Sequence, residues 1–233
     1  MYEEIPQRLA RIRERIAEAA GRAGRKPDDV RLIAVSKTHP IDAVRAAAAA
    51  GQIDFGENKV QEALQKIAQS TDTTLKWHLI GHLQSNKARK AAGAVGAIHA
   101  IDSVELLKRV DQAASEASRT VDVLIQVDLA LEDTKHGASV GEVPAIVKAA
   151  GDCTAVTLTG LMLLPPLADN PEDARPWFRR LRALRDELVD SGVAADRLRE
   201  LSMGMSHDFE VAIAEGATMV RVGTAIFGER DYL

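Results

Sequence analysis

The chain has 233 residues, of which 46% are hydrophobic, and it carries a formal net charge of -4. This length and hydrophobic content predict one folded domain, residues 1–233, with a sizeable core, and they argue against a disordered chain. Lys+Arg (30) and Asp+Glu (34) nearly balance and aromatic residues are only 3%, which argues against a nucleic-acid-binding surface.

The chain begins with a predicted amphipathic helix that ends near residues 21–27, and short apolar runs then alternate with helical segments. The predicted strands are 31–36, 52–55, 76–80, 97–101, 121–128, 155–163, 200–203 and 218–222. The clearest helical segments between them are 41–50, 58–69, 103–118 and 172–190. About eight βα units predict a single (β/α)8 TIM barrel, of the α/β class, with an extra N-terminal helix. An open doubly wound sheet shares this alternation, but it would carry a Gly-rich turn where this sequence has SKTHP.

The same sequence features predict a soluble cytoplasmic protein. Cys153 is the only cysteine, which excludes an internal disulfide and fits a reducing compartment. Charged residues interrupt the apolar stripe of the first helix, so it is not expected to be a signal peptide. No later segment is long and apolar enough to span a bilayer, and no membrane partner is therefore expected.

Lys37 is the first candidate for chemistry. It follows the apolar run 30–36 (VRLIAVS) at the carboxyl end of the first predicted strand, where barrels carry their reacting groups. Most lysines are solvated, but an amine held against an apolar interior has its ammonium form disfavoured and can condense with an aldehyde. Lys37 is therefore a candidate for Schiff-base formation.

Two segments rich in small residues end the seventh and eighth predicted strands, at 202–206 (SMGMS) and 221–224 (RVGT). Barrels commonly hold a phosphate on backbone N–H groups at these positions. Gly223 permits close backbone approach, and Ser206 and Thr224 can add hydroxyl donors. Ser206 alone is explained equally well as the cap of the following helix. Together, and opposite the lysine, the two segments favour a phosphorylated ligand.

Arg221 alternates with two valines on the eighth predicted strand, so its side chain should point opposite to theirs, toward the barrel mouth. There it either pairs with a buried carboxylate, such as Glu57, or contacts the ligand. Beside a pyridine nitrogen an arginine donates a hydrogen bond and discourages ring protonation, which makes the ring a weaker electron sink.

Polar residues at other strand ends are ambiguous. Asn58 can cap the next helix as readily as contact a ligand. His78 and His82 are four residues apart, but a strand end lies between them and no His-Glu-x-x-His pattern occurs, so no metal site is predicted. The segment 135–137 (KHG) is predicted to be a solvated loop.

Six motifs carry a family resemblance: SKTHP, FGENKVQEA, WHLIGHLQSNKAR, GLMLLPP, LSMGMSHDFEVAI and VRVGTAIFG. Together they resemble the pyridoxal phosphate homeostasis protein family, from the N-terminal helix to Phe227. This family is a single barrel similar to the N-terminal domain of alanine racemases, and it holds pyridoxal 5'-phosphate (PLP) as an internal aldimine.

The resemblance implies a role for several residues. Lys37 would be the Schiff-base lysine, Arg221 would face the pyridine nitrogen, and Asn58 would lie near the cofactor. Three residues would hold the phosphate, namely Ser206, Gly223 and Thr224. Two methionines would form walls of the pocket, namely Met203 and Met162.

The sequence departs from the family pattern at three positions. Lys59 stands where the family often has tyrosine, His82 where proline is common, and Asp128 where asparagine is common. These departures bear on the polarity of the pocket rather than on cofactor binding.

The resulting prediction is a PLP-binding protein of intracellular PLP homeostasis, with PLP held on Lys37 and without a defined turnover reaction or catalytic residue. PLP is the expected partner, PLP-dependent apo-enzymes are left open as partners, and a monomer is favoured over an obligate oligomer. The first alternative is a PLP-dependent amino-acid racemase or minor transaminase. Such racemases use a base from a second, β-rich domain, for which a chain ending at Leu233 leaves no room. The second alternative is a phosphosugar aldolase that uses Lys37.

Overall fold

The computed structural model describes residues 2–130 and 136–229. Eight parallel strands form a closed barrel in chain order, and β8 pairs with β1. The strands are β1 (Arg31–Val35), β2 (Asp54–Glu57), β3 (Lys76–Leu79), β4 (Ala97–Ile101), β5 (Val121–Gln126), β6 (Val156–Met162), β7 (Glu200–Met205) and β8 (Met219–Val222). The predicted (β/α)8 barrel is confirmed.

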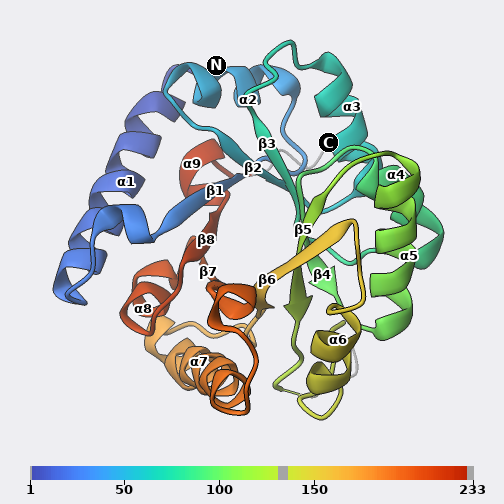
Figure 1. Ribbon diagram of the computed structural model, residues 1–233. Coiled ribbons are helices and arrows are strands. Elements are labelled where there is room, and N and C mark those ends of the chain that lie inside the picture. The colour runs from blue at the N-terminus through green and yellow to red at the C-terminus, as the bar shows by residue number, and fades with distance from the viewer. Residues whose placement is uncertain (1, 131–135, 230–233) are drawn as a thin grey trace.

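Helices surround the strands as an outer ring (Figure 1). In the described residues the α-helices are α1 (Ile5–Arg22), α2 (Ile41–Ala49), α3 (Val60–Gln69), α4 (Ala88–Ala92), α5 (Val104–Glu116), α6 (Val143–Ala149), α7 (Arg175–Asp190), α8 (Phe209–Ala214) and α9 (Thr224–Phe227). Helices α2 to α8 each connect two consecutive parallel strands, so all strand ends of one kind meet at the same mouth of the barrel.

The extra N-terminal helix α1 packs against α8 and α9. Its buried residues recur every three to four positions, at Ile5, Leu9, Ile12, Ile16, Ala19 and Ala20. Arg15 fixes the packing, because its guanidinium binds both carboxylate oxygens of Glu210, at 2.8 and 3.0 Å, and lies 4.6 Å from the centre of the Phe209 ring. The apolar stripe of α1 therefore covers the part of the barrel wall that α8 and α9 form.

The core has two parts. The larger part lies between the strands and the helices, and it includes Val220 and Val222 of β8. A small cluster fills the barrel interior, namely Ile33, Leu124, Met162 and Met219. Arg221, between the two valines, bonds to Ser202 of β7 rather than joining that helix-facing layer, as the alternation of strand side chains requires.

Most strand boundaries differ by one or two residues from the sequence-based prediction. The second strand begins at Asp54, because the backbone N–H of Gln52 donates to the backbone oxygen of Ala47 in α2 (3.1 Å) rather than to a neighbouring strand. The buried side chain of Gln52 donates to the backbone oxygens of Leu32 and Asp54, both at 2.8 Å. The seventh strand continues to Met205, two residues beyond the predicted end. The longer β7 matters for the site, because it leads directly to Ser206, which lines the cavity described below together with Met205.

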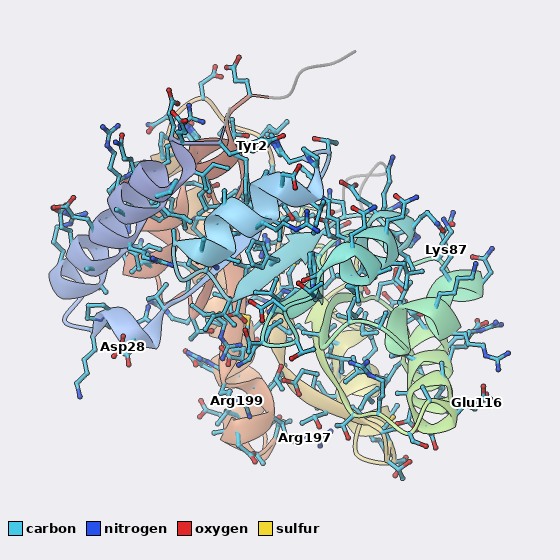
Figure 2. All side chains as sticks on the ribbon, turned by 90° about the horizontal axis from the view of Figure 1, so that it is seen from above. Tyr2, Asp28, Lys87, Glu116, Arg197 and Arg199 are labelled. Carbon is cyan, nitrogen blue, oxygen red and sulfur yellow. The ribbon has the colours of Figure 1, made fainter. Side chains whose placement is uncertain are left out.

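The outer surface is strongly charged. Figure 2 shows Asp28, Lys87, Glu116 and Arg197 at the periphery of the molecule. Within the part of the chain that the structure describes, no helix combines the length and the apolar character needed to cross a bilayer.

Candidate functional site

A cavity of about 540 Å³ opens at the carboxyl ends of the strands. Its lining comes from residues at or just beyond the ends of β1, β2, β3, β6, β7 and β8. Six of the seven predicted binding residues line it: Lys37, Asn58, Ser206, Arg221, Gly223 and Thr224. The barrel therefore brings together residues that lie up to 187 positions apart in the sequence (224 minus 37).

Lys37 is half-buried two residues beyond β1. Strand β1 pairs with β2 on one side and with β8 on the other, so that Ala34 lies opposite both Phe55 and Val222. This register puts the lysine between the end of β2, which leads to Asn58, and the end of β8. Lys37 therefore lines the same cavity as Asn58, which follows β2, and Thr224, which follows β8.

Ser206 joins the ends of β7 and β8. Its hydroxyl oxygen accepts hydrogen bonds from the backbone N–H groups of Gly223 (3.2 Å) and Ala225 (3.5 Å), and helix α8 has no side-chain cap. The capping explanation of Ser206 is therefore not what the structure shows. A Cβ on Gly223 would lie 3.1 Å from the backbone oxygen of Val35, so a glycine there lets β8 pass β1 closely. Small groups and N–H donors converge here, as an anion site requires.

Arg221 is 3% exposed and lines the cavity. Its guanidinium donates to the hydroxyl of Ser202 (2.7 Å) and to the backbone oxygen of Leu163 (2.8 Å). Burial lowers its pKa to about 10, against a smaller opposing effect of Asp208. The arginine is still cationic at neutral pH, and the two groups that accept its hydrogen bonds are uncharged.

Glu57, the predicted alternative partner of Arg221, belongs to a different cluster. Its Oε1 accepts from the amine of Lys66 at 2.6 Å and from the hydroxyl of Ser36 at 2.5 Å. Lys66 was missed at the sequence level, although its place on α3, three and six residues after the buried Ala63 and Val60, is a usable signal.

A chain of buried polar side chains crosses the barrel interior and ends at Arg221. Asp54 binds His78 (2.9 Å), His78 binds His99 (3.1 Å), and His99 binds the hydroxyl of Ser202 (2.9 Å), which receives the bond from the arginine. Burial holds the pKa of His99 well below 6.5, and His78, Arg221 and Arg31 act in the same direction. No sequence pattern indicated this row of hydrogen bonds, because its members come from five different strands.

Of the three departures from the family pattern, only His82 lines the cavity. Its ring stacks on that of His136, with centroids 3.6 Å apart and planes at 12°. Burial, and then His136, lower the pKa of His82, whereas Asp102, 3.7 Å away, opposes this. The loop containing His136 thus contacts the cavity wall rather than being only solvated. Residue Lys135 of that loop lies outside the described residues.

The other two departures lie elsewhere. Lys59 lines a neighbouring groove between α2 and α3, and the Asp128 carboxylate accepts a hydrogen bond from the N–H of Ala130. Across residues 2–130 and 136–229, no group of three or more His, Cys, Asp or Glu side chains could hold a metal ion.

Met203 is not brought to the cavity. It is fully buried in the core between strands and helices, and Met205 lines the cavity instead. The cause is strand alternation, because Ser202 points into the barrel and its neighbour must point outward. The pairing of β7 with β8 then shifts between Ser202 and Met205, which turns Met205 toward the mouth. Met162 lies deeper, in the interior cluster.

The arrangement has the chemical parts of a site for a phosphorylated carbonyl compound. One primary amine lies in a cavity with a cup of small residues and N–H donors, and a cationic guanidinium forms part of the wall. The amine can attack a carbonyl carbon, and the cup can accept a dianionic phosphate.

Comparison with protein families gives a match to the alanine racemase N-terminal domain over residues 7–231. A pyridoxal phosphate homeostasis protein from Aquifex aeolicus is 45% identical over 226 residues, which cover 97% of this chain and 98% of that protein. A protein of the same name from Pseudomonas aeruginosa is 43% identical and covers 98% and 96% of the two chains.

Comparison with solved structures gives matches to the same family and to the same fold. PipY of Synechococcus elongatus, solved with PLP bound, superposes with a TM-score of 0.85 at 42% identity, covering 96% of this chain and all of that one. Alanine racemase from Corynebacterium glutamicum gives a TM-score of 0.75 at 18% identity, and the match covers 98% of this chain but 62% of the racemase. The second likeness shows the fold alone.

Proposed function

This chain belongs to the pyridoxal phosphate homeostasis protein family, and from that premise we propose that it binds PLP in the strand-end cavity as part of PLP homeostasis. The observation that carries the proposal is the convergence of Lys37 with Ser206, Gly223 and Thr224 on one cavity. PLP would supply an aldehyde that reacts with amines and a pyridine ring that withdraws electrons.

The residues fit the parts of this cofactor. Lys37 would bind the aldehyde carbon covalently. Ser206, Gly223 and Thr224 would hold the phosphate, where two N–H groups already converge on the Ser206 hydroxyl. Arg221 would donate to the pyridine nitrogen and so keep it unprotonated, since a guanidinium has no acceptor. Asn58 would contact the ligand from the end of β2.

Arg221 supports a binding protein over a racemase. A ring whose nitrogen faces a fixed cation is a poor electron sink, and removal of an α-proton is then poorly supported. The likeness to the solved alanine racemase, at 18% identity, is a likeness of fold and carries no activity with it.

The test is to locate the covalent attachment. The purified protein is incubated with PLP, reduced with borohydride to fix the cofactor on its amine, and digested for peptide mass analysis. We expect the label on Lys37 and none in Lys37→Ala, whose far-ultraviolet circular dichroism should match the wild type. Lys87→Ala, which removes an exposed lysine, is the matched control and should label normally. Label on Lys87 or Lys135 with Lys37 unmodified would refute the assignment.

We further propose that the protein acts in the cytoplasm as a monomer that exchanges PLP with PLP-dependent apo-enzymes. The single Cys153 supports a reducing compartment. The proposal predicts one protomer in light scattering and recovery of an apo-aminotransferase's activity when the loaded protein is added. Transfer no faster than from the same concentration of free PLP would argue against direct exchange.

A further inference from the structure

The two peptide groups that flank Lys37 are both held by side chains of one helix, α3. The backbone oxygen of Ser36 accepts a hydrogen bond from the amine of Lys66, 2.6 Å away. The backbone N–H of Thr38 donates to Oε1 of Glu62. One bond thus acts on the peptide before Lys37 and the other on the peptide after it.

The two side chains are also bound to each other. Glu62 and Lys66 are four residues apart, on the same face of α3, and Nζ of Lys66 lies 2.9 Å from Oε1 of Glu62. Their order, acid before base, is the favourable one in a helix. A shift of either the Glu62 or the Lys66 side chain would therefore move both peptide groups that flank Lys37.

The backbone at the second of these bonds is strained. Thr38 has a φ of +67°, in the left-handed region that a β-branched residue rarely occupies. Such a conformation costs on the order of 1–3 kcal/mol and persists only where the surroundings enforce it. The hydrogen bond from Thr38 to Glu62 is a local interaction that can enforce it.

The anchor of this arrangement is buried. The Lys66 side chain is 6% exposed, and its amine is 2.6 Å from Oε1 of the fully buried Glu57. Burial raises the pKa of the Glu57 carboxyl, against the effects of Lys66 and Ser36. Within the described residues, Oε2 of Glu57 has no hydrogen-bond partner.

A buried ion pair of this kind adds little net stability compared with apolar residues of the same size. The pair instead fixes the position of the Lys66 amine, because both buried side chains are confined to one arrangement. The carboxylate of Glu57 fixes Lys66, and Lys66 in turn fixes the backbone beside Lys37.

We propose that Glu62 and Lys66 are positioning residues that hold the Lys37 backbone so that its amine meets the carbonyl carbon of the ligand at the right distance and angle. The inference rests on the proposed function, in which that amine binds PLP. It assigns to α3, outside the cavity wall, a part in covalent attachment rather than in noncovalent binding.

The test separates attachment from noncovalent binding. Stopped-flow absorbance gives the rate of covalent attachment of PLP, and equilibrium dialysis gives the affinity for pyridoxine 5'-phosphate, which has the phosphate and the ring but no aldehyde. Glu62→Ala removes the acceptor of the Thr38 N–H. Lys66→Met with Glu57→Gln removes the buried pair without leaving a lone charge at the fully buried position 57, and Glu62 remains partly exposed. Lys108→Met, which removes an exposed lysine of α5, is the control.

A misplacement of about 1 Å can slow a reaction roughly 100-fold, so we expect attachment to slow by about tenfold or more in Glu62→Ala and in the double variant. Affinity for pyridoxine 5'-phosphate should change less than about twofold, since the phosphate cup is untouched. Lys108→Met should behave as wild type in both measurements.

Either of two results would overturn the inference. Attachment at the wild-type rate in folded Glu62→Ala would show that the bond to Thr38 does not position the lysine. An equal loss of attachment and of pyridoxine 5'-phosphate affinity would show a general structural role. Glu62 is partly exposed, so its variant tests the inference even if the double variant fails to fold. Failure of the wild type itself to attach PLP at Lys37 would instead refute the proposed function.

Discussion

At the scale of single residues, the site depends on a few small groups that allow backbones to approach closely. Ser206 and Gly223 share a hydrogen bond between two strand ends, and Gly81 lies directly against Asn58. Each position has a substitution that changes one contact and leaves the barrel core in place.

Ser206→Ala should weaken PLP binding by about tenfold or more, because a hydrogen bond to a charged group contributes about 1.5–3 kcal/mol. Binding of pyridoxal, which lacks the phosphate, should change little. The measurement is an equilibrium titration with both ligands. Ser191→Ala, which removes a hydroxyl at the end of α7, is the control. An equal loss for both ligands would mean that Ser206 supports the loop rather than the phosphate.

Gly81→Ala should both destabilise the protein and weaken ligand binding. A Cβ at position 81 would lie 2.8 Å from Cα of Asn58 and would overlap its carbonyl oxygen, so the end of β2 must move. Overpacking of this kind costs about 1–3 kcal/mol, measurable by urea unfolding. Gly141→Ala, where a Cβ meets nothing within 4 Å, should be nearly neutral. Wild-type stability and affinity in Gly81→Ala would show that this contact relaxes freely.

At the scale of elements, the polar chain from Asp54 to Arg221 links β2, β3, β4, β7 and β8 through the barrel interior. Its central member, His99, is fully buried. Because burial disfavours the protonated form of His99, these hydrogen bonds form with His99 neutral. Protonation of His99 at low pH should therefore disrupt its bonds to His78 and Ser202.

The pH dependence follows from the direction of the His99 shift. The folded-state pKa lies well below 6.5, so the unfolded chain binds the proton more readily. The stabilisation is present in full above pH 6.5 and is lost as pH falls toward the folded-state pKa. This one proton contributes up to about 1.4 kcal/mol per pH unit to the free energy of unfolding.

Urea titrations between pH 5 and 8 test this on the wild type and on His99→Gln, which keeps a donor and an acceptor but does not titrate. The wild type should lose stability more steeply with falling pH than the variant. His82, whose pKa is also lowered, is present in both proteins and cancels in the comparison. Identical slopes would assign the acid sensitivity to other groups.

At the scale of the whole molecule, the ligand should stabilise the barrel, because the residues proposed to bind it come from four different strand ends. A ligand at 100 times its Kd stabilises the folded state by about 2.7 kcal/mol. For a chain of this size, each kcal/mol raises the Tm by about 2–4 °C. PLP should therefore raise the Tm by roughly 5–10 °C.

Differential scanning fluorimetry at several PLP concentrations gives this shift. Lys37→Ala should show a smaller shift at the same PLP concentration, because only the noncovalent contacts remain. Inorganic phosphate serves as the control for binding at the cup alone. A PLP shift no larger than that of phosphate would mean that the ring and the aldehyde contribute nothing to binding.

Much of the fold and the site was predictable from the sequence. Strands and helices leave periodic apolar patterns in the chain, so the barrel could be predicted from about eight βα units together with the lack of a Gly-rich turn after the first strand. Lys37, Ser206, Gly223 and Thr224 could be singled out because each stands at a strand end, and in a parallel barrel all such ends share one mouth.

Only the tertiary structure decided which side chains contact one another within the barrel. A single residue of register moves a side chain to the other face of a strand, which is why Met205 and not Met203 lines the cavity. The bonds of Lys66 to Ser36, and of His99 to Ser202, join residues 30 and 103 positions apart. No local pattern encodes such pairs, because they exist only once the closing of the barrel has set the distances between strands.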